Sequence, residues 1–245
     1  MGVFDQDGFA ARFEWGAEGL RTLAPSVDQL VIVDVLSFST AVEVATARGA
    51  GVIPYAFRDA SASETARQKG AVLAVNRNEM SDEHPYSLSP GSLTRLPRGS
   101  VLVLPSPNGS TLTTLASRSH PVLAGCLRNA RPVASWTRHK SVGVIAAGEL
   151  RQDGTLRFAI EDLIGAGAIL SHFPVNQRSP EAEVAVAIFQ HVEHDLFHHL
   201  QECASGRELS RAGFAGDVAM AAELDVSETV PLFLSQGWYA DVGSI

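Results

Sequence analysis

Short apolar runs alternate with amphipathic segments over the first two-thirds of the chain, and this alternation is the strongest constraint on the fold. Compact runs such as 30–33 (LVIV) and 101–104 (VLVL) predict buried strands. After the first run, Ser39 and Thr40 open a predicted helix, and Gly49 ends it. Repeated strand–loop–helix units favour a parallel sheet with helices on both faces. We therefore expect an α/β protein, a three-layer α/β/α fold with a mostly parallel mixed sheet.

The remaining segments follow the same reasoning. Predicted strands cover 30–33, 51–57, 71–75, 101–104, 122–124 and 142–147, with a late strand at 230–234. Predicted helices cover 41–48, 59–69, 110–116, a stretch from about 129, 159–170, one long helix over 181–205, and 213–224. We expect an α/β domain over 1–175 that carries most of the site. A helical C-terminal segment over 176–245 packs on it, unless the two form one continuous domain.

Charge and composition exclude several classes of protein. The formal net charge is −8, and no basic stripe suited to nucleic acid is visible. No signal peptide is read at the N-terminus, and no apolar stretch reaches the roughly 18 residues of a membrane span. We expect a cytoplasmic protein with no nucleic-acid or membrane partner, and leave a homodimer open. Because parallel sheets bind ligands beyond the carboxyl ends of their strands, we look for the site there.

Asp34 is the first candidate for that site, because it directly follows a buried strand. A carboxylate in this position can bind a hard cation such as Mg²⁺ or attack phosphorus. Ser39 and Thr40 lie at the start of the next helix, where free backbone N–H groups favour anions. The alternative for Ser39 is an ordinary helix cap.

Two further candidates follow later strands. The turn 107–111 contains Asn108, Gly109 and Ser110, a pattern that suits either a structural turn or an anion-binding nest. After the sixth predicted strand come 148–149 (Gly-Glu) and then 161–162 (Glu-Asp) at a helix start. Glu161 and Asp162 can share one Mg²⁺, although an acid in a first helical turn is also common.

Other charged residues give weaker signals. Arg77, Arg128 and Arg151 lie in loops after strands, where each can pair with a phosphate or sulfonate. Four histidines decorate the long predicted helix, but no HExxH motif is present, so we favour a solvated face over zinc. The sequence also lacks GxxxxGK[ST], which makes P-loop chemistry unlikely.

Several segments, taken together and in order, resemble the 2-phosphosulfolactate phosphatase family over about residues 30–245. The segments are VIVDVLSFSTAVEVATARGA, SPNGST, CLRNA, AAGELRQDGTLRFAIEDLIGAGAIL and GDVAMAAELDVSETVP. The resemblance implies a Mg²⁺-dependent phosphatase on a mixed α/β fold, acting on 2-phosphosulfolactate or a related phosphorylated 2-hydroxy acid. It implies a small anionic phosphorylated substrate as a partner and Mg²⁺ as the cofactor.

The resemblance also implies roles for individual residues. Asp34, Glu161 and Asp162 become the expected metal ligands and catalytic carboxylates. The residues expected around the substrate are Ser39, Thr40, Arg77, Asn108, Gly109, Ser110, Cys126 and Asn129.

The sequence departs from the family pattern near the expected anion site. The family usually has Arg-Ala-Ser-Thr after Asp-Val-Leu, whereas this chain has Ser37-Phe38-Ser39-Thr40 and so lacks one arginine. The family's Gly-Glu-Arg-Gly-Gly block is reduced to 75–79, where Arg77 alone remains. Two alternatives therefore stay open: an anion-binding protein with weak or no catalysis, and a hydrolase with Cys126 as its nucleophile.

Overall fold

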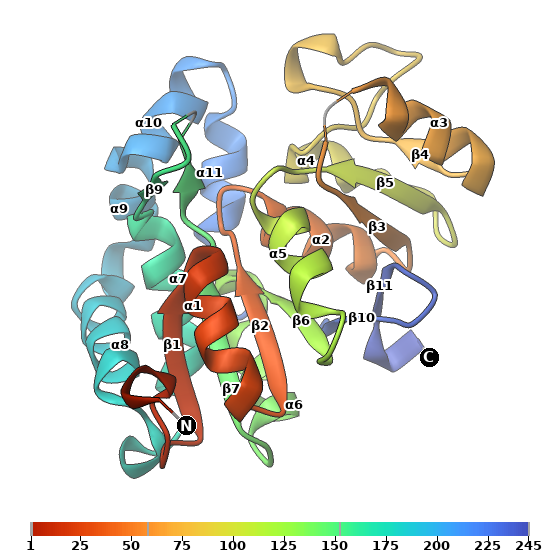
Figure 1. Ribbon diagram of the computed structural model, residues 1–245. Coiled ribbons are helices and arrows are strands. Elements are labelled where there is room, and N and C mark those ends of the chain that lie inside the picture. The colour runs from red at the N-terminus through yellow and green to blue at the C-terminus, as the bar shows by residue number, and fades with distance from the viewer. Residues whose placement is uncertain (1, 58, 152, 245) are drawn as a thin grey trace.

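Short β-branched strands form the centre of the molecule (Figure 1). The computed structural model describes residues 2–57, 59–151 and 153–244. Within these residues, nine strands form one sheet in the order β1-β7-β2-β6-β10-β11-β3-β5-β4. The strands are β1 (Ala11–Trp15), β2 (Gln29–Val33), β3 (Gly51–Tyr55), β4 (Val72–Leu73), β5 (Val101–Pro105), β6 (Val122–Gly125), β7 (Val142–Ala146), β10 (Pro231–Phe233) and β11 (Tyr239–Asp241).

The sheet is mixed and mostly parallel, which confirms the predicted fold class. Strands β1, β7, β2 and β6 are parallel to one another, and so are β3, β5 and β4. The antiparallel strands β10 and β11 join the two groups through the pairs Leu232–Leu123 and Tyr239–Val52. The late strand predicted at 230–234 therefore exists, and it lies in the middle of the sheet.

Helices cover both faces of the sheet, as the alternation of side chains along β2 shows. Leu30 and Ile32 pack in a cluster with residues of α1 (Gly16–Leu23) and α5 (Gly109–Ala116). Val31 and Val33 face the opposite way, into a cluster that includes α6 (Ala130–Thr137), α7 (Ile160–Ser171) and α8 (Pro180–Val192). All five residues of β2 are buried, as expected for a strand covered on both faces. The other helices on the body of the molecule are α2 (Phe38–Ala47), α3 (Ala60–Lys69) and α4 (Pro90–Leu93).

The prediction of one long helix over 181–205 is wrong. Helix α8 ends at Val192, and α9 (Leu196–Glu202) and α10 (Ala204–Arg211) follow as separate helices. Asp195 caps α9 by accepting a hydrogen bond from the backbone N–H of His198, at 3.4 Å. The sulfur of Cys203 accepts one from the N–H of Gly206 at the start of α10. These side chains offer the backbone an alternative to a continuous helix, which the apolar periodicity alone did not reveal. Helix α11 (Ala215–Ala221) follows.

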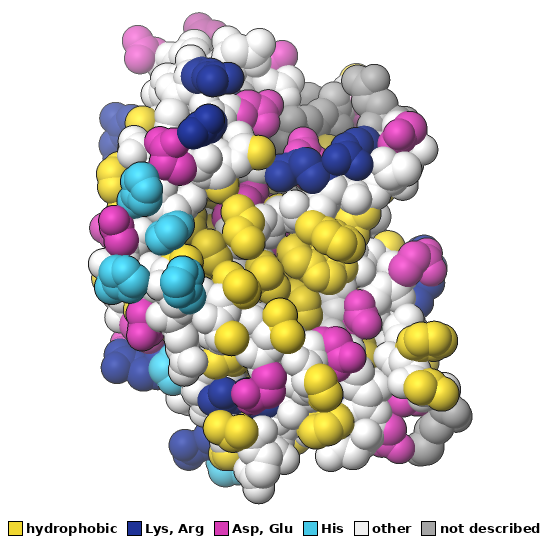
Figure 2. Space-filling view, turned by 90° about the vertical axis from the view of Figure 1, so that its left-hand side faces the viewer, with side chains coloured by type: hydrophobic (Ala, Val, Ile, Leu, Met, Phe, Trp, Pro, Cys, Tyr) yellow, Lys and Arg dark blue, Asp and Glu magenta, His cyan; other side chains and the backbone are white. Residues whose placement is uncertain are grey.

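An open apolar hollow of about 410 Å³ lies beside the edge strand β1. Trp15 and Phe158 stack there, with ring centroids 4.8 Å apart. Figure 2 shows hydrophobic side chains gathered in the middle of the face that lies on the left of Figure 1. The homodimer that the sequence left open stays a prediction. Across the described ranges, no helix is long and apolar enough to cross a membrane.

The start of α5 is packed tightly against the start of α2. A Cβ atom at Gly109 would lie 2.1 Å from the Cδ1 atom of Phe38 and 2.4 Å from its Cγ atom. The backbone N–H of Gly109 also donates a hydrogen bond to Asp34, at 3.1 Å. Glycine is therefore required at this position for close approach and not for a left-handed backbone.

We expect Gly109→Ala to lower the free energy of unfolding by about 1–3 kcal/mol, because the methyl group overpacks a fully buried ring. Chemical denaturation measures this loss. Gly216→Ala is the matched control, because a Cβ atom at Gly216 on α11 would meet nothing within 4 Å. Equal stability of the two variants would contradict the close packing.

Candidate functional site

A cavity of about 190 Å³ lies where loops after several strands meet. Asp34 follows β2, Asn108 follows β5, and Arg77 follows β4. Glu161 and Asp162 come from the first turn of α7. The complete lining is Asp34, Leu36, Ser37, Arg77, Leu88, Ser106, Pro107, Asn108, Gly148, Glu149, Arg157, Ala159, Glu161, Asp162, Ser205, Glu208 and Leu209. The structure thus brings five of the residues predicted to bind metal or substrate to one site, together with the Gly148-Glu149 pair; their chemical roles stay predictions.

Asp34 is almost completely buried and is held by the starts of two helices. The backbone N–H of Phe38 donates to its Oδ1 atom at 3.3 Å, and the N–H of Gly109 donates to its Oδ2 atom at 3.1 Å. These are the first residues of α2 and α5. Amide groups that we expected to face a bound anion therefore point at the protein's own carboxylate, which they stabilise through the helix dipoles.

Asp162 ties the loop after β2 to the loop after β7. The N–H groups of Val35 and Gly148 donate to its two carboxylate oxygens, at 2.8 and 2.9 Å. Burial raises the pKa of Asp162 well above its ordinary value, and the nearby charges of Asp34 and Glu161 raise it further. The carboxyl group of Asp162 is therefore held close to two other acids in a place that disfavours its ionised form.

Glu161 is the third buried acid at the cavity. Only 3% of its surface is exposed, and its Oε2 atom has no hydrogen-bond partner among the described residues. The thiol of Cys203 lies against the Glu161 side chain, and burial, followed by the charge of Glu161, raises the pKa of Cys203 to about 12. A buried carboxylate oxygen without a partner costs free energy, so Glu161 is suited to a ligand that supplies the missing partner.

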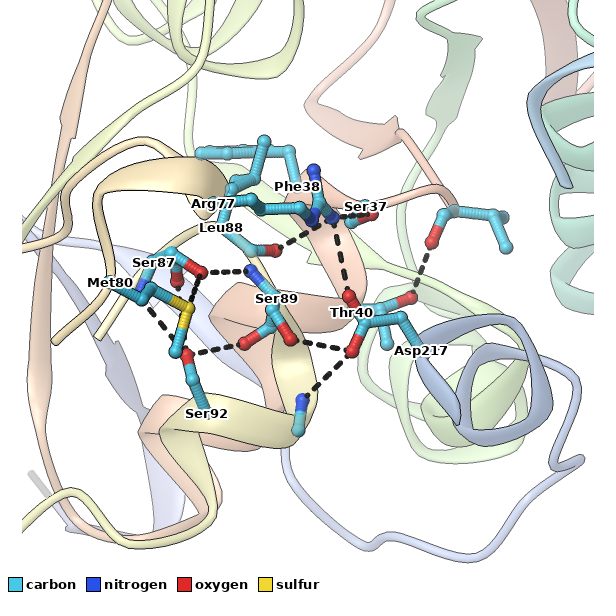
Figure 3. A network of polar contacts seen from close by, with 12 residues as sticks. Ser37, Phe38, Thr40, Arg77, Met80, Ser87, Leu88, Ser89, Ser92 and Asp217 are labelled. Atoms are coloured by element: carbon cyan, nitrogen blue, oxygen red, sulfur yellow. Dashed lines mark hydrogen bonds and ion pairs between the residues drawn. The ribbon is translucent and has the colours of Figure 1, made fainter. Parts of the chain in front are cut away.

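Arg77 is held by a network that joins three distant parts of the chain (Figure 3). Its Nη2 atom donates to the hydroxyl of Ser37 at 2.7 Å, and to the carbonyl oxygen of Leu88 at 3.4 Å. Asp217 on α11 accepts from the same atom at 3.5 Å and from the hydroxyl of Ser89 at 2.6 Å. The guanidinium also lies over the Phe214 ring, 5.3 Å from its centroid. These contacts fix the direction of the arginine at the cavity.

Six of the eight predicted substrate residues lie outside the lining of the cavity: Ser39, Thr40, Gly109, Ser110, Cys126 and Asn129. Ser39, Thr40 and Ser110 are fully buried, and each hydroxyl donates to a backbone carbonyl oxygen, at 2.9, 2.8 and 3.3 Å respectively. Ser39 also accepts a hydrogen bond from the N–H of Asp34 at 2.9 Å. The hydroxyls of Ser39 and Thr40 close the turn after β2 that orients Asp34. Ser39 is not the helix cap considered as its alternative, because the N-cap residue of α2 is Ser37 and Ser39 lies within the helix.

Cys126 and Asn129 are also fully buried and outside the lining. The side chain of Asn129 accepts from the N–H of Cys126 at 2.9 Å and donates to the carbonyl oxygens of Ala124 and Thr229, at 3.3 and 3.1 Å. Burial raises the pKa of Cys126 to about 12, so its thiol stays protonated at neutral pH. The burial of Cys126 outside the cavity argues against its role as a nucleophile.

The remaining charged candidates, Arg128 and Arg151, do not line the cavity. Arg128 pairs with Glu43 at 2.6 Å and with Glu223, away from the cavity. Arg151 is exposed and bonds to the hydroxyl of Thr155 at 3.4 Å. Within the part of the chain that the structure describes, no group of three or more His, Cys, Asp or Glu side chains is arranged to hold a metal ion by itself.

Arg157 is the residue at the cavity that our sequence analysis missed. It lies on β9 (Leu156–Arg157), which pairs with β8 (Glu149–Leu150), so that Glu149 and Arg157 are directly opposite. Asp153-Gly154 lies between the two strands. An Asp-Gly pair between short strands is a strong hairpin signal, and it would have placed Arg157 beside Glu149.

Comparison with known proteins places the chain in a family. The family model for 2-phosphosulpholactate phosphatase matches residues 20–236. A protein of Carboxydothermus hydrogenoformans named probable 2-phosphosulfolactate phosphatase is 28% identical over 207 residues, which cover 82% of this chain and 84% of that protein. Proteins with the same name from Thermotoga petrophila and Thermosynechococcus vestitus are 26% and 23% identical, and each match covers 88% of that protein. The match covers 84% of this chain for the first and 83% for the second.

This chain therefore belongs to the 2-phosphosulfolactate phosphatase family. Its relatives are named as phosphatases, so the chain is an enzyme of the phosphoric monoester hydrolase class.

The raised pKa of Asp162 predicts a dependence of stability on pH. The unfolded group titrates near the ordinary value of 3.8, whereas the folded group holds its proton to higher pH. Stability that this proton contributes is therefore lost as the pH rises from the unfolded pKa through the folded pKa. In Asp162→Asn the loss disappears, so we expect a flatter stability curve at pH values above the ordinary pKa of 3.8.

Urea denaturation in the presence of a chelator measures this curve. An Asn side chain has one oxygen and accepts only one of the two backbone N–H bonds, so we expect the free energy of unfolding of the variant to be about 1–3 kcal/mol lower. The readout is the slope of the free energy of unfolding against pH. Asp28→Asn is the control, because hydrogen bonds from Ser141 lower the pKa of the exposed Asp28 and it stays ionised over this range. Parallel curves for wild type and Asp162→Asn would exclude an altered titration of Asp162.

Proposed function

We propose that the cavity hydrolyses a small phosphomonoester, 2-phosphosulfolactate or a related phosphorylated 2-hydroxy acid, with the help of Mg²⁺. The observation that carries the proposal is the convergence of three buried acids, Asp34, Glu161 and Asp162, on one cavity that Arg77 also lines. At about 190 Å³, the cavity suits a small molecule and not a polymer.

The balance of charge at the cavity supports the need for a cation. Five carboxylates and two guanidinium groups line it, which gives a formal charge of −3: Asp34, Glu149, Glu161, Asp162 and Glu208 against Arg77 and Arg157. A phosphate dianion entering such a cavity would be repelled. Mg²⁺ in enzymes is commonly held by one or two carboxylates together with water and substrate phosphate, so a closed cage of three protein ligands is not needed.

The residues present fit such an ion. The Oε2 atom of Glu161 is buried with no partner, and the pKa of Asp162 is raised by burial and by the charges of Asp34 and Glu161. A bound cation would give the Oε2 atom of Glu161 a partner and would stabilise the ionised form of Asp162. We propose that Glu161 and Asp162 would hold it together with water and the substrate phosphate, with Asp34 as a further ligand or as the group that attacks phosphorus, and that it would supply neutralisation of the phosphate charge and orientation of the reacting groups.

The protein's own groups do the positioning. The N–H groups of Phe38 and Gly109 fix Asp34, so it reaches the phosphate without rearranging, either as a cation ligand or as the group that attacks phosphorus. Arg77 binds the phosphate oxygens through charge-assisted hydrogen bonds. Ser37, which stands where the family usually has an arginine, accepts a hydrogen bond from Arg77 and helps to direct that guanidinium at the site.

Asp34→Asn is expected to lower the rate of phosphate release at least 100-fold, because a group at the reacting phosphate is lost. Release of phosphate from 2-phosphosulfolactate and from other phosphorylated 2-hydroxy acids, with Mg²⁺ and with a chelator, is the measurement. Asp28→Asn is the matched control. Asp28 immediately precedes β2, whereas Asp34 immediately follows it, and its carboxylate is likewise held by hydrogen bonds, here from Ser141.

Wild-type protein should release phosphate with Mg²⁺ and lose that activity with the chelator. Full activity of Asp34→Asn would remove Asp34 from the mechanism. Tight binding of these esters by the wild type, with no release above background, would instead favour an anion-binding protein.

A further inference from the structure

Arg157 occupies the wall of the cavity formed by the β8–β9 hairpin, and its side chain is 23% exposed. Its Nε atom donates to the Oε2 atom of Glu149 at 2.8 Å, and its Nη2 atom lies 2.7 Å from the same oxygen. The Nη2 atom also donates to the hydroxyl of Ser205 at 2.7 Å. Two nitrogens of the guanidinium are thus fixed by the hairpin and by α10.

The third nitrogen, Nη1, makes no hydrogen bond to any of the residues that the structure describes. Glu149, the partner of the other two, has a side chain that is 47% exposed, so it can turn toward solvent when another anion takes its place. The guanidinium is therefore fixed in position and still able to bind a carboxylate or sulfonate through two donors, which is the geometry that arginine favours.

Arg77 and Arg157 reach the cavity from different elements, and the C-terminal helices hold both. Asp217 on α11 holds Arg77, whereas Ser205 on α10 holds Arg157. Both arginines line the same cavity of about 190 Å³. A small substrate with one anion at Arg77 therefore has its other groups within reach of Arg157.

We propose that Arg157 is a specificity-determining residue that binds the second anionic group of the substrate, a carboxylate or sulfonate, while Arg77 binds the phosphate. Ser205 is a positioning residue for Arg157. This inference rests on the proposed phosphatase function, and it adds which residue distinguishes a phosphorylated acid from a simple alkyl phosphate.

Two substrates that differ only in the second anion test the proposal. Racemic 2-phospholactate carries a carboxylate where isopropyl phosphate carries a methyl group. We expect the wild type to prefer 2-phospholactate by about ten- to hundredfold in kcat/KM, as for one lost charge-assisted interaction. Arg157→Gln should lose this preference, because its kcat/KM for 2-phospholactate should fall much more than its kcat/KM for isopropyl phosphate.

Two variants separate specificity from general damage. Arg157→Lys keeps the charge without the two-donor fork, so it should recover only part of the preference. Arg151→Gln removes the same charge from the exposed connection of the same hairpin and should keep the full preference. Wild-type preference in Arg157→Gln, or no preference in the wild type, overturns the proposal while the phosphatase function stands.

Equilibrium binding of non-hydrolysable analogues gives a readout that is independent of turnover. Calorimetry compares 2-methyl-3-phosphonopropanoate with 2-methylpropylphosphonate, in which a methyl group replaces the carboxylate. The wild type should bind the first about ten- to hundredfold more tightly, and Arg157→Gln should bind both alike. If the wild type hydrolyses neither ester but shows this difference in binding, the assignment of Arg157 holds and the phosphatase proposal fails. If it binds neither analogue, the assignment of Arg157 is overturned.

Discussion

Repulsion among buried carboxylates is the constraint on which the rest of the site depends. Asp34, Glu161 and Asp162 are each at most 8% exposed, and they meet at one cavity. Like charges in a poorly solvated place cost several kcal/mol unless donors or cations offset them. The fold offsets part of this cost with backbone N–H groups, four of which donate to the two aspartates. The part left over includes the Oε2 atom of Glu161, which has no hydrogen-bond partner among the described residues, and it is the observation on which the proposed cation rests.

The same N–H groups explain how the fold and the site are coupled. Asp162 joins the loops after β2 and β7, and Asp34 joins the starts of α2 and α5. The acids are therefore structural crosslinks between neighbouring strand–helix units as well as candidates for chemistry. A site built in this way is pre-organised, because its charged groups are oriented by the chain before any substrate arrives. It also explains why the serine and threonine hydroxyls nearby are turned toward the backbone and away from the cavity.

The sequence predicted those parts of the fold that depend on local pattern. The buried strand at 30–33 and the acid after it were readable, because a β-branched run followed by a polar residue and a helix cap has few other interpretations. The hairpin that carries Arg157 was missed because each of its strands has only two residues, too few for any periodicity. The break in the helix after Val192 was missed for a different reason. The apolar spacing continues across it, while the side-chain caps at Asp195 and Cys203 decide the geometry.

Non-local pairing sets the other limit of sequence reasoning, and the C-terminal segment illustrates it. Strands β10 and β11 enter the middle of the sheet, between segments more than 100 residues earlier in the chain, and no local pattern contains that information. Their insertion returns the chain to the sheet after α10 and α11 have passed the cavity, where Ser205 and Asp217 hold the two arginines. The C-terminal helices thus orient both arginines and add Glu208 to the acids that the strand–helix units supply. With the proposed role of Arg157, substrate specificity depends on contacts made by the C-terminal helices, whereas most of the negative charge comes from the strand–helix units.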